Sequence, residues 1–224
     1  MIEFVFKRTE IEDINELLAN KVEKSFDIKF GKTELNHIST FGELCDHIAN
    51  KIQLEHSEDC TTQQAFYKLR NAISSKFKID KKTISTDSQI IDFLPRWNRR
   101  SMITEIEKHL GFKLNILCPP HFVSMFLFIL CLASFVGLYF NWQIGILGLI
   151  ISIGGLLVAD KIGIELEVKT VGEIAKKMTR ENYLKSRRNS KKFNKNEIEK
   201  VLIDLFINDL GLDKSKFNRD TKFT

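Results

Sequence analysis

The sequence predicts an all-α protein in which helical bundles carry an inserted two-helix transmembrane hairpin. Two observations predict this fold class. Charged residues make up 28% of the 224-residue sequence, but they almost vanish in one stretch past its middle. Outside that stretch, several segments with apolar residues at helical spacing resemble one another, which is typical of a duplicated helical unit.

Two uncharged runs form the predicted transmembrane hairpin, which occupies residues 122–159. The runs from Phe122 to Phe140 and from Gln143 to Ala159 contain no charged residue. Each approaches the ~20 residues with which a helix crosses ~30 Å of hydrocarbon, although the second run is slightly short. The alternative is a hairpin buried in a soluble core, but a domain of this size has little sequence to surround two such helices. The position of the runs, past the middle of the chain, does not fit a secretory signal peptide.

Basic residues flank the predicted hairpin on both sides. The turn around Asn141 and Trp142 holds aromatic and amide side chains but no Lys or Arg. By the positive-inside bias, both flanks are predicted to be cytoplasmic, and only the turn reaches the far side. We therefore expect an integral membrane protein, of a bacterial inner membrane, with its N- and C-terminal regions in the cytoplasm. The flanking residues are Arg96, Arg99, Arg100, Lys108 and Lys113 before the hairpin and Lys161, Lys169, Lys176, Lys177 and Arg180 after it.

The hairpin is predicted to be an anchor and not a transporter. Neither run contains an ionisable residue of the kind that a proton relay, an ion path or a substrate site normally needs. Glycines instead recur in or beside the runs, where small residues let two helices approach closely. These glycines are Gly137, Gly145, Gly148, Gly154 and Gly155.

The soluble sequence contains repeated segments. In the first pair, Thr40 to Ile48 resembles Thr170 to Met178. Each segment begins with a threonine that can cap a helix, followed three residues later by a glutamate, as in a capping box.

Two further pairs of segments also match. Residues 65–90 align with residues 198–223 without a gap, as one helix and its following loop. Residues 18–26 align with residues 102–110, as an amphipathic helix with apolar residues at four-residue spacing. A short apolar step follows each copy of this helix.

Together, the repeated segments resemble the acyl carrier protein family. The resemblance holds when they are taken in this order: a helix with a long loop after it, a second helix, a short apolar step, and a last helix with a threonine cap. The closest stretch is Phe26-Asp27-Ile28-Lys29-Phe30 followed by Ile38-Ser39-Thr40-Phe41-Gly42-Glu43-Leu44, which is similar to the end of a carrier protein. The loop from Ile84 to Pro95 is similar to the one between the family's first and second helices, including its Asp-Phe-Leu step. The resemblance implies small four-helix bundles for nearly all of the soluble sequence.

The resemblance implies two bundles in a permuted order. The middle bundle takes its first and second helices from residues 62–118 and its last helix from residues 165–183, with the hairpin inserted between them. The other bundle takes its later helices from residues 1–53 and its first helix from residues 194–224. Chain ends that lie near each other permit such a permutation. The alternative is that the terminal pieces pair between chains, in a homo-oligomer.

The attachment serine of the carrier family is missing. Carrier proteins bind phosphopantetheine through a serine in an Asp-Ser-Leu motif at the start of the second helix, where a helix N-terminus suits a phosphate. The corresponding residues, Leu94 to Arg100 and Thr9 to Ile14, contain no Asp-Ser. Ser88 lies too early, in an expected turn, and Ser101 lies inside the expected second helix. We therefore expect no prosthetic arm and no cofactor. The alternative is a membrane-tethered carrier protein of lipid or polyketide metabolism, modified at Ser88 or Ser101.

The charge of the expected second helix also differs from the family. Carrier proteins usually present an acidic second helix, whereas Arg96, Arg99 and Arg100 make this one basic at its start. Because complementary potentials largely set which partner docks, an acidic protein or anionic lipid headgroups are the expected partners. The basic residues between Lys185 and Lys192 lack aromatic stacking partners, so they are interpreted as a solvated linker near the membrane and not as a nucleic-acid site.

No catalytic or metal site is predicted. Cys45, His47, His56 and Cys60 are close in sequence, but Cys45 falls on the apolar stripe of its helix and His47 does not. The sequence has no glycine-rich phosphate loop, no nucleophile elbow and no convincing pair of catalytic carboxylates. It therefore predicts a membrane-anchored docking or assembly module that is not an enzyme, with membrane lipids and an acidic protein as partners.

Overall fold

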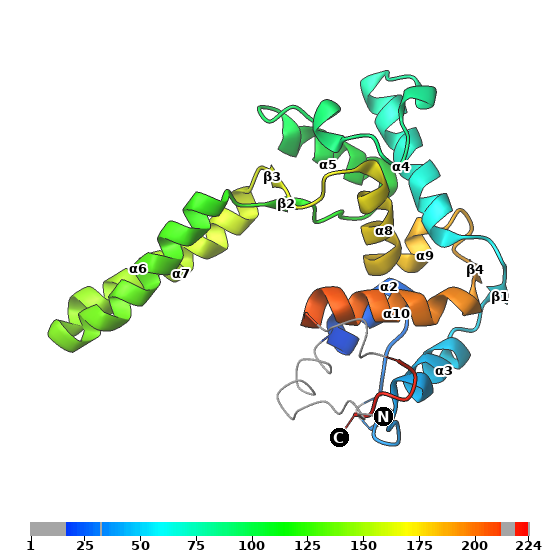
Figure 1. The fold of residues 1–224 in the computed structure, drawn as a ribbon, viewed down its shortest axis with the longest axis horizontal. Coiled ribbons are helices and arrows are strands. Elements are labelled where there is room, and N and C mark those ends of the chain that lie inside the picture. Colours follow the sequence, from blue (N-terminus) through cyan, green and yellow to red (C-terminus); the bar gives the residue numbers. More distant parts are fainter. Residues whose placement is uncertain (1–16, 32, 212–217, 224) are drawn as a thin grey trace. The chain divides into compact units, whose positions relative to one another are not determined.

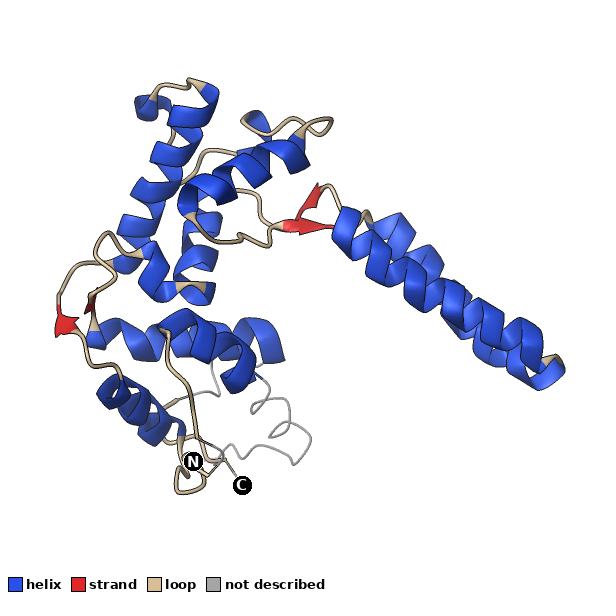
Figure 2. Cartoon of the chain, turned by 180° about the vertical axis from the view of Figure 1, so that it is seen from behind, coloured by secondary structure: helices blue, strands red, loops and turns tan. Residues whose placement is uncertain are grey.

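The computed structural model describes residues 17–31, 33–211 and 218–223 of the chain. The structure is mostly helical, with 64% helix and 6% strand, and it contains two apolar helices that could span a membrane. Figure 1 shows the order of the elements, and Figure 2 shows that the strands are short segments between helices. The chain divides into two compact units.

The first unit comprises residues 1–86 and 171–224. Its strands β1 and β4 pair in parallel, with Glu55 opposite Lys192. Its helix α4 packs along α8. The elements described in this unit are η1 (Leu18–Val22, a π-helical turn), α2 (Glu23–Phe26), α3 (Phe41–Lys51), β1 (Glu55–His56), α4 (Thr61–Phe77), η2 (Lys81–Thr83), α8 (Val171–Glu181), α9 (Tyr183–Ser186), β4 (Lys192–Phe193) and α10 (Lys195–Leu210).

Segments from both ends of the chain share one buried core. Phe41 of α3 packs against Phe206 of α10, with ring centroids 5.5 Å apart. Phe26 of α2 packs against Tyr183 of α9, with centroids 5.1 Å apart. The terminal pieces therefore contact each other within one chain, and aromatic burial of this kind is among the largest contributions to a small core.

Helix α3 begins with the predicted threonine cap. Thr40 Oγ1 accepts a hydrogen bond from Glu43 N at 3.2 Å, and the Glu43 carboxylate accepts one from Thr40 N at 3.2 Å. This reciprocal capping box satisfies two backbone donors that a helix end otherwise leaves free. The sequence prediction for this helix start is confirmed.

The repeated segments make matching backbone contacts. Gly42 N donates to Arg219 O, and Gly172 N donates to Thr86 O, both at 2.8 Å. A Cβ atom would lie 3.0 Å from the carbonyl oxygen at Gly42 and 2.8 Å from it at Gly172, so both glycines permit a close backbone approach. The two accepting residues, Thr86 and Arg219, occupy equivalent positions in the alignment of residues 65–90 with residues 198–223.

A second backbone contact is duplicated in the same segments. Phe223 N donates to Ser39 O, and Ile90 N donates to Lys169 O, both at 2.9 Å. In each case the residue that donates ends the aligned loop, and the residue that accepts precedes the start of a helix. The sequence alignment of these loops therefore has a structural counterpart.

The third pair of repeated segments, residues 18–26 and 102–110, is followed by the same hydrogen bond in both copies. Glu23 Oε1 accepts from Phe30 N at 2.6 Å, and Glu107 Oε1 accepts from Leu114 N at 2.8 Å. A glutamate near the end of each helix thus holds the apolar step that follows the helix.

The second unit, residues 87–170, contains the helical hairpin. Helices α6 and α7 pack along each other (Figure 1), and the predicted runs, Phe122 to Phe140 and Gln143 to Ala159, lie within them. The elements described in this unit are η3 (Ile90–Asp92), α5 (Arg99–Leu110), β2 (Leu117–Cys118), α6 (His121–Phe140), α7 (Trp142–Ile162) and β3 (Glu165–Leu166).

Candidate functional site: the hairpin and its neck

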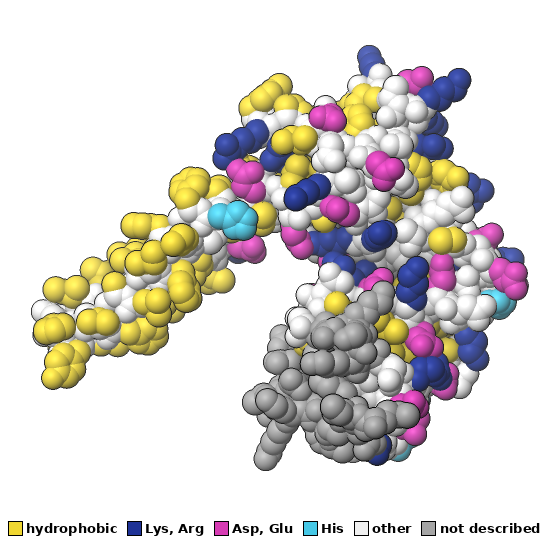
Figure 3. Space-filling view, viewed as in Figure 1, with side chains coloured by type: hydrophobic (Ala, Val, Ile, Leu, Met, Phe, Trp, Pro, Cys, Tyr) yellow, Lys and Arg dark blue, Asp and Glu magenta, His cyan; other side chains and the backbone are white. Residues whose placement is uncertain are grey.

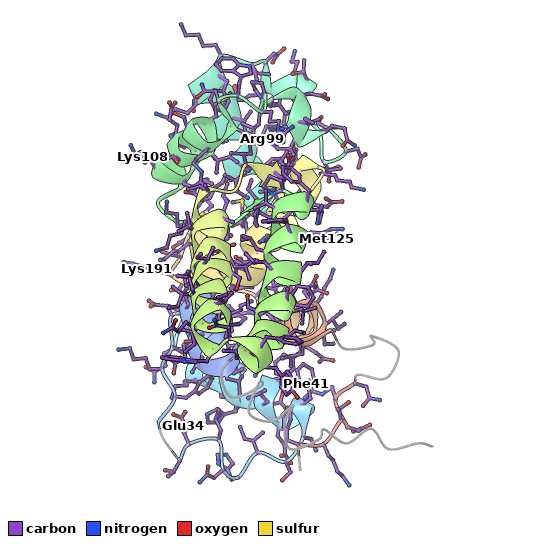
Figure 4. All side chains as sticks on the ribbon, turned by 90° about the vertical axis from the view of Figure 1, so that its left-hand side faces the viewer. Glu34, Phe41, Arg99, Lys108, Met125 and Lys191 are labelled. Carbon is purple, nitrogen blue, oxygen red and sulfur yellow. The ribbon has the colours of Figure 1, made fainter. Side chains whose placement is uncertain are left out.

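The hairpin exposes apolar side chains along its length. Only 11% of the most apolar 18-residue stretch of α6 is buried, and 17% of that of α7. Met125, for example, projects from α6 away from α7 (Figure 4), and hydrophobic side chains cover the face of the hairpin that is visible in Figure 3. Both helices are long and apolar enough to cross a membrane. This exposure does not fit the core helices of a soluble protein.

Three glycines on α7 let the two helices approach closely. A Cβ atom would lie 2.2 Å from Ser134 Oγ at Gly148, 2.5 Å from Leu138 N at Gly145 and 2.9 Å from a Leu127 methyl at Gly155. At Gly145 the blocking atom belongs to the backbone, so α6 itself would have to move; at Gly148 and Gly155 it belongs to a side chain of α6, which would have to shift. The helix pair is therefore shaped by these small residues, as expected for an apolar environment in which close packing replaces the hydrophobic effect.

Polar side chains within the hairpin form hydrogen bonds with the backbone of the hairpin itself. The Ser134 hydroxyl donates to Leu130 O at 2.6 Å, and the Ser152 hydroxyl donates to Leu149 O at 3.1 Å. At the turn, Asn141 Oδ1 accepts from Gln143 N at 3.0 Å and caps α7. A hairpin in hydrocarbon needs such internal partners, since water does not supply them.

The two chain segments at the base of the hairpin form a neck. We define the neck as residues 116–119, which lead into α6, and residues 163–167, which follow α7. Strands β2 and β3 pair antiparallel there, with Leu117 opposite Leu166, and Glu167 N donates to Ile116 O at 3.0 Å. A Cβ atom at Gly163 would lie 2.4 Å from the carbonyl carbon of Cys118, so only glycine permits this approach.

Arg99, the first residue of α5 (labelled in Figure 4), connects that helix to the neck. Its side chain is 2% exposed. Arg99 Nε donates to Leu94 O at 3.0 Å, and Nη1 donates to Ile164 O at 2.7 Å. Nη1 also lies 3.8 Å from Glu165 Oε2. One guanidinium thus joins the start of α5 to the segment that leaves α7.

Two neighbouring arginines contact the same segment. Arg100 Nη2 donates to Gly163 O at 2.7 Å, and Arg96 Nη2 lies 2.6 Å from Glu165 Oε1. These residues were expected to form a basic docking face. That expectation is wrong for Arg99, because it is buried, whereas the Arg96 side chain is 61% exposed. All three arginines of this basic cluster therefore use their side chains in contacts with the neck.

We expect Arg99→Met to destabilise the neck by about 2 kcal/mol, because two backbone carbonyls lose a charged donor. The measurement is urea unfolding of the full chain in mild detergent, followed by far-UV circular dichroism. Arg96→Met is the control, with an expected loss below about 1 kcal/mol for a largely exposed ion pair. Equal losses in the two variants would contradict the buried role of Arg99.

The candidate serines differ in exposure. Ser101 is exposed in the first turn of α5, whereas Ser88 is half-buried in the loop before η3 and has an interaction partner. Neither serine lies in an Asp-Ser-Leu motif. The stretch from Thr9 to Ile14 lies outside the described residues.

The cysteines and histidines noted in the sequence make separate contacts. Cys45 is buried, and burial raises the pKa of its thiol to about 12. His47 Nε2 lies 2.8 Å from Glu34 Oε1, and His56 Nδ1 accepts from Lys195 N at 3.5 Å. Among the described residues, no three His, Cys, Asp or Glu side chains come together in a group that could hold a metal ion.

The basic linker contains a buried residue that the sequence interpretation missed. Arg187 is 1% exposed, and its Nη1 donates to Asp59 O at 3.2 Å and lies 3.8 Å from Glu197 Oε2. The interpretation of this segment as solvated is therefore wrong at Arg187. The adjacent Tyr183 hydroxyl donates to Glu197 Oε2 at 3.0 Å, and burial raises the pKa of Tyr183 above its ordinary value.

The neck was not predicted from the sequence, although two signals for it were present. A glycine, Gly163, directly follows the second apolar helix, and an acidic residue, Glu165, lies two positions later. Glu165 follows the hairpin in the sequence, and Arg96, Arg99 and Arg100 precede it, so this carboxylate could have suggested an internal ion pair at the base of the hairpin.

Comparison of the chain with protein-family models, with curated proteins and with solved structures finds no match in any of the three.

Proposed function

We propose that the protein is a hairpin-anchored docking or assembly module at the cytoplasmic surface of a membrane, built on acyl carrier-like helical bundles without a prosthetic arm. The observation that carries the proposal is the exposed, uncharged hairpin formed by α6 and α7. Its helices have 20 and 21 residues, which matches the ~20 residues that cross the hydrocarbon of a bilayer.

The two ends of the hairpin support a spanning orientation. Tyr139, Phe140 and Trp142 are exposed at the turn, and aromatic residues favour the boundary between lipid and water. The turn has no Lys or Arg, whereas Lys113 and Lys161 lie close to the base. The base would therefore face the cytoplasm, together with the sequence on either side of it.

The duplicated contacts support the acyl carrier-like part of the proposal. The capped helix at Thr40 and the paired backbone contacts at Gly42 and Gly172 lie in the segments that repeat in the sequence, and this duplication supports the proposal. Since a shared fold does not carry activity with it, the missing Asp-Ser motif favours a docking role over a carrier role. An acidic protein remains the partner that suits exposed basic residues such as Arg96.

The test is expression of the full chain together with a phosphopantetheinyl transferase, followed by membrane fractionation and intact-mass measurement. We expect the chain to stay with membranes through an alkaline carbonate wash, to enter solution with detergent and to keep its unmodified mass. A monomer that is soluble without detergent would overturn the anchor.

A mass gain equal to the phosphopantetheine arm would instead favour the second candidate, a membrane-tethered carrier protein. The exposure of Ser101 is the observation that keeps this candidate open. Loss of the gain in Ser101→Ala would assign the attachment to that serine, and its persistence would move the assignment to Ser88.

A further inference from the structure

The second unit contains a hollow beside the neck. Its volume is about 490 Å³, within the range of about 300–1,000 Å³ that small-molecule sites occupy. α5, the segment leading into the hairpin and the last turn of α7 form its walls. Its charged lining residues are Arg100, Lys113, Lys161, Glu107, Asp160 and Glu167.

We propose that this hollow binds a zwitterionic phospholipid headgroup with a primary ammonium, as in phosphatidylethanolamine. The inference rests on the proposed membrane insertion of the hairpin. The lining has three basic and three acidic side chains, so its formal charges balance. An anion alone would meet three carboxylates, and a cation alone would meet three basic groups. A ligand with a phosphate and an ammonium offers a partner to both kinds.

Some of the lining charges are held in place and others are open to a ligand. Arg100 Nη2 donates to Gly163 O at 2.7 Å, which fixes the guanidinium at the edge of the neck. Lys113 Nζ lies 2.9 Å from Glu107 Oε2. Asp160 and Lys161 are both exposed and form no ion pair with any other residue that the structure describes. These last two groups can therefore contact a headgroup directly.

The position of the hollow suits a lipid. Asp160 and Lys161 lie in the last turn of α7, directly after its apolar run, where a spanning helix reaches the level of the headgroups. Val158 and Ile162, on the same part of α7, are exposed and would face the acyl chains of a lipid whose headgroup enters the hollow.

The ammonium distinguishes ethanolamine from choline. A primary ammonium has three N–H donors that can bond the exposed Asp160 carboxylate, and a quaternary ammonium has none. Hydrogen bonds between charged groups are the stronger kind. The phosphate would accept from Lys161 and Arg100, so the site discriminates among lipids through its acidic residues.

The test measures lipids bound to the purified full chain by native mass spectrometry. The chain is exchanged into detergent and offered phosphatidylethanolamine, phosphatidylcholine or phosphatidylglycerol with identical acyl chains. We expect retained phosphatidylethanolamine to exceed each of the other lipids about tenfold, the effect of one hydrogen bond between charged groups. The double variant Asp160→Asn, Lys161→Gln should remove this preference.

The double variant Glu105→Gln, Lys108→Gln is the control, because these exposed residues of α5 do not line the hollow. It should keep the preference. Equal retention of ethanolamine and choline lipids would overturn the proposal, and preference for phosphatidylglycerol would replace it with an anionic headgroup site. Carbonate extraction of the membranes from which the chain is purified distinguishes these outcomes from failure of the anchor, in which the chain leaves the membrane before purification and retains no lipid.

Discussion

Gly145→Leu is expected to force the two helices of the hairpin apart. A Cβ atom at this position would lie 2.5 Å from Leu138 N and 2.7 Å from Leu138 Cα. These are backbone atoms, so no rotation of a side chain relieves the clash, and α6 itself has to shift. Overpacking a tight interface costs about 1–3 kcal/mol or more, and a leucine adds three further carbon atoms to the first clash.

The measurement is unfolding of the hairpin by titration with sodium dodecyl sulfate in mixed micelles. Fluorescence of Trp142, in a Trp97→Phe background, reports on the end of the hairpin. The sodium dodecyl sulfate fraction at which half of the hairpin is unfolded should fall strongly for Gly145→Leu. Gly154→Leu is the matched control on the same helix, because a Cβ atom there has nothing within 4 Å. Similar midpoints for the two variants would show that α6 and α7 do not approach at Gly145.

Glu197→Ala is expected to destabilise the first unit strongly. The Glu197 carboxylate accepts from Thr61 N at 3.0 Å and from the Tyr183 hydroxyl at 3.0 Å. It also lies 3.8 Å from Arg187 Nη1, and the Arg187 side chain is 1% exposed. Removing one partner of a buried ion pair leaves an uncompensated charge, which costs about 3–5 kcal/mol.

Glu199→Ala is the control for this prediction. Glu199 lies on the same helix, α10, and its ion pair with Arg219 at 2.8 Å joins side chains that are 39% and 44% exposed. We expect a loss below about 1 kcal/mol for such a pair. Urea unfolding of the full chain in detergent compares the two variants. If Glu197→Ala loses no more stability than Glu199→Ala, the buried cluster does not stabilise the unit.

Features that depend on neighbouring residues could be predicted from the sequence. The two uncharged runs predicted α6 and α7, and Thr40 with Glu43 predicted the capping box of α3. The limits of α7 were less accurate, since the helix continues through Asp160 and Lys161 to Ile162. Backbone hydrogen bonds extend a helix past the point where its apolar residues end.

Features that depend on distant residues could not be predicted. Arg99 and Arg187 look exposed by residue type, because isolated charges are rarely buried. Each is buried by partners far along the chain, Ile164 O for Arg99 and Thr61 Oγ1 for Arg187. Only the fold brings these atoms together, so composition and periodicity assign both arginines to the surface.

The paired strands of the neck make the hairpin a separable cassette. Ile116 O and Glu167 N are 3.0 Å apart, so the polypeptide enters and leaves the hairpin segment at adjacent points. A short peptide could bridge that gap in place of the whole insertion, without displacing the flanking backbone. The same geometry would let the hairpin be inserted or removed as one piece while the paired backbone of the neck keeps its conformation.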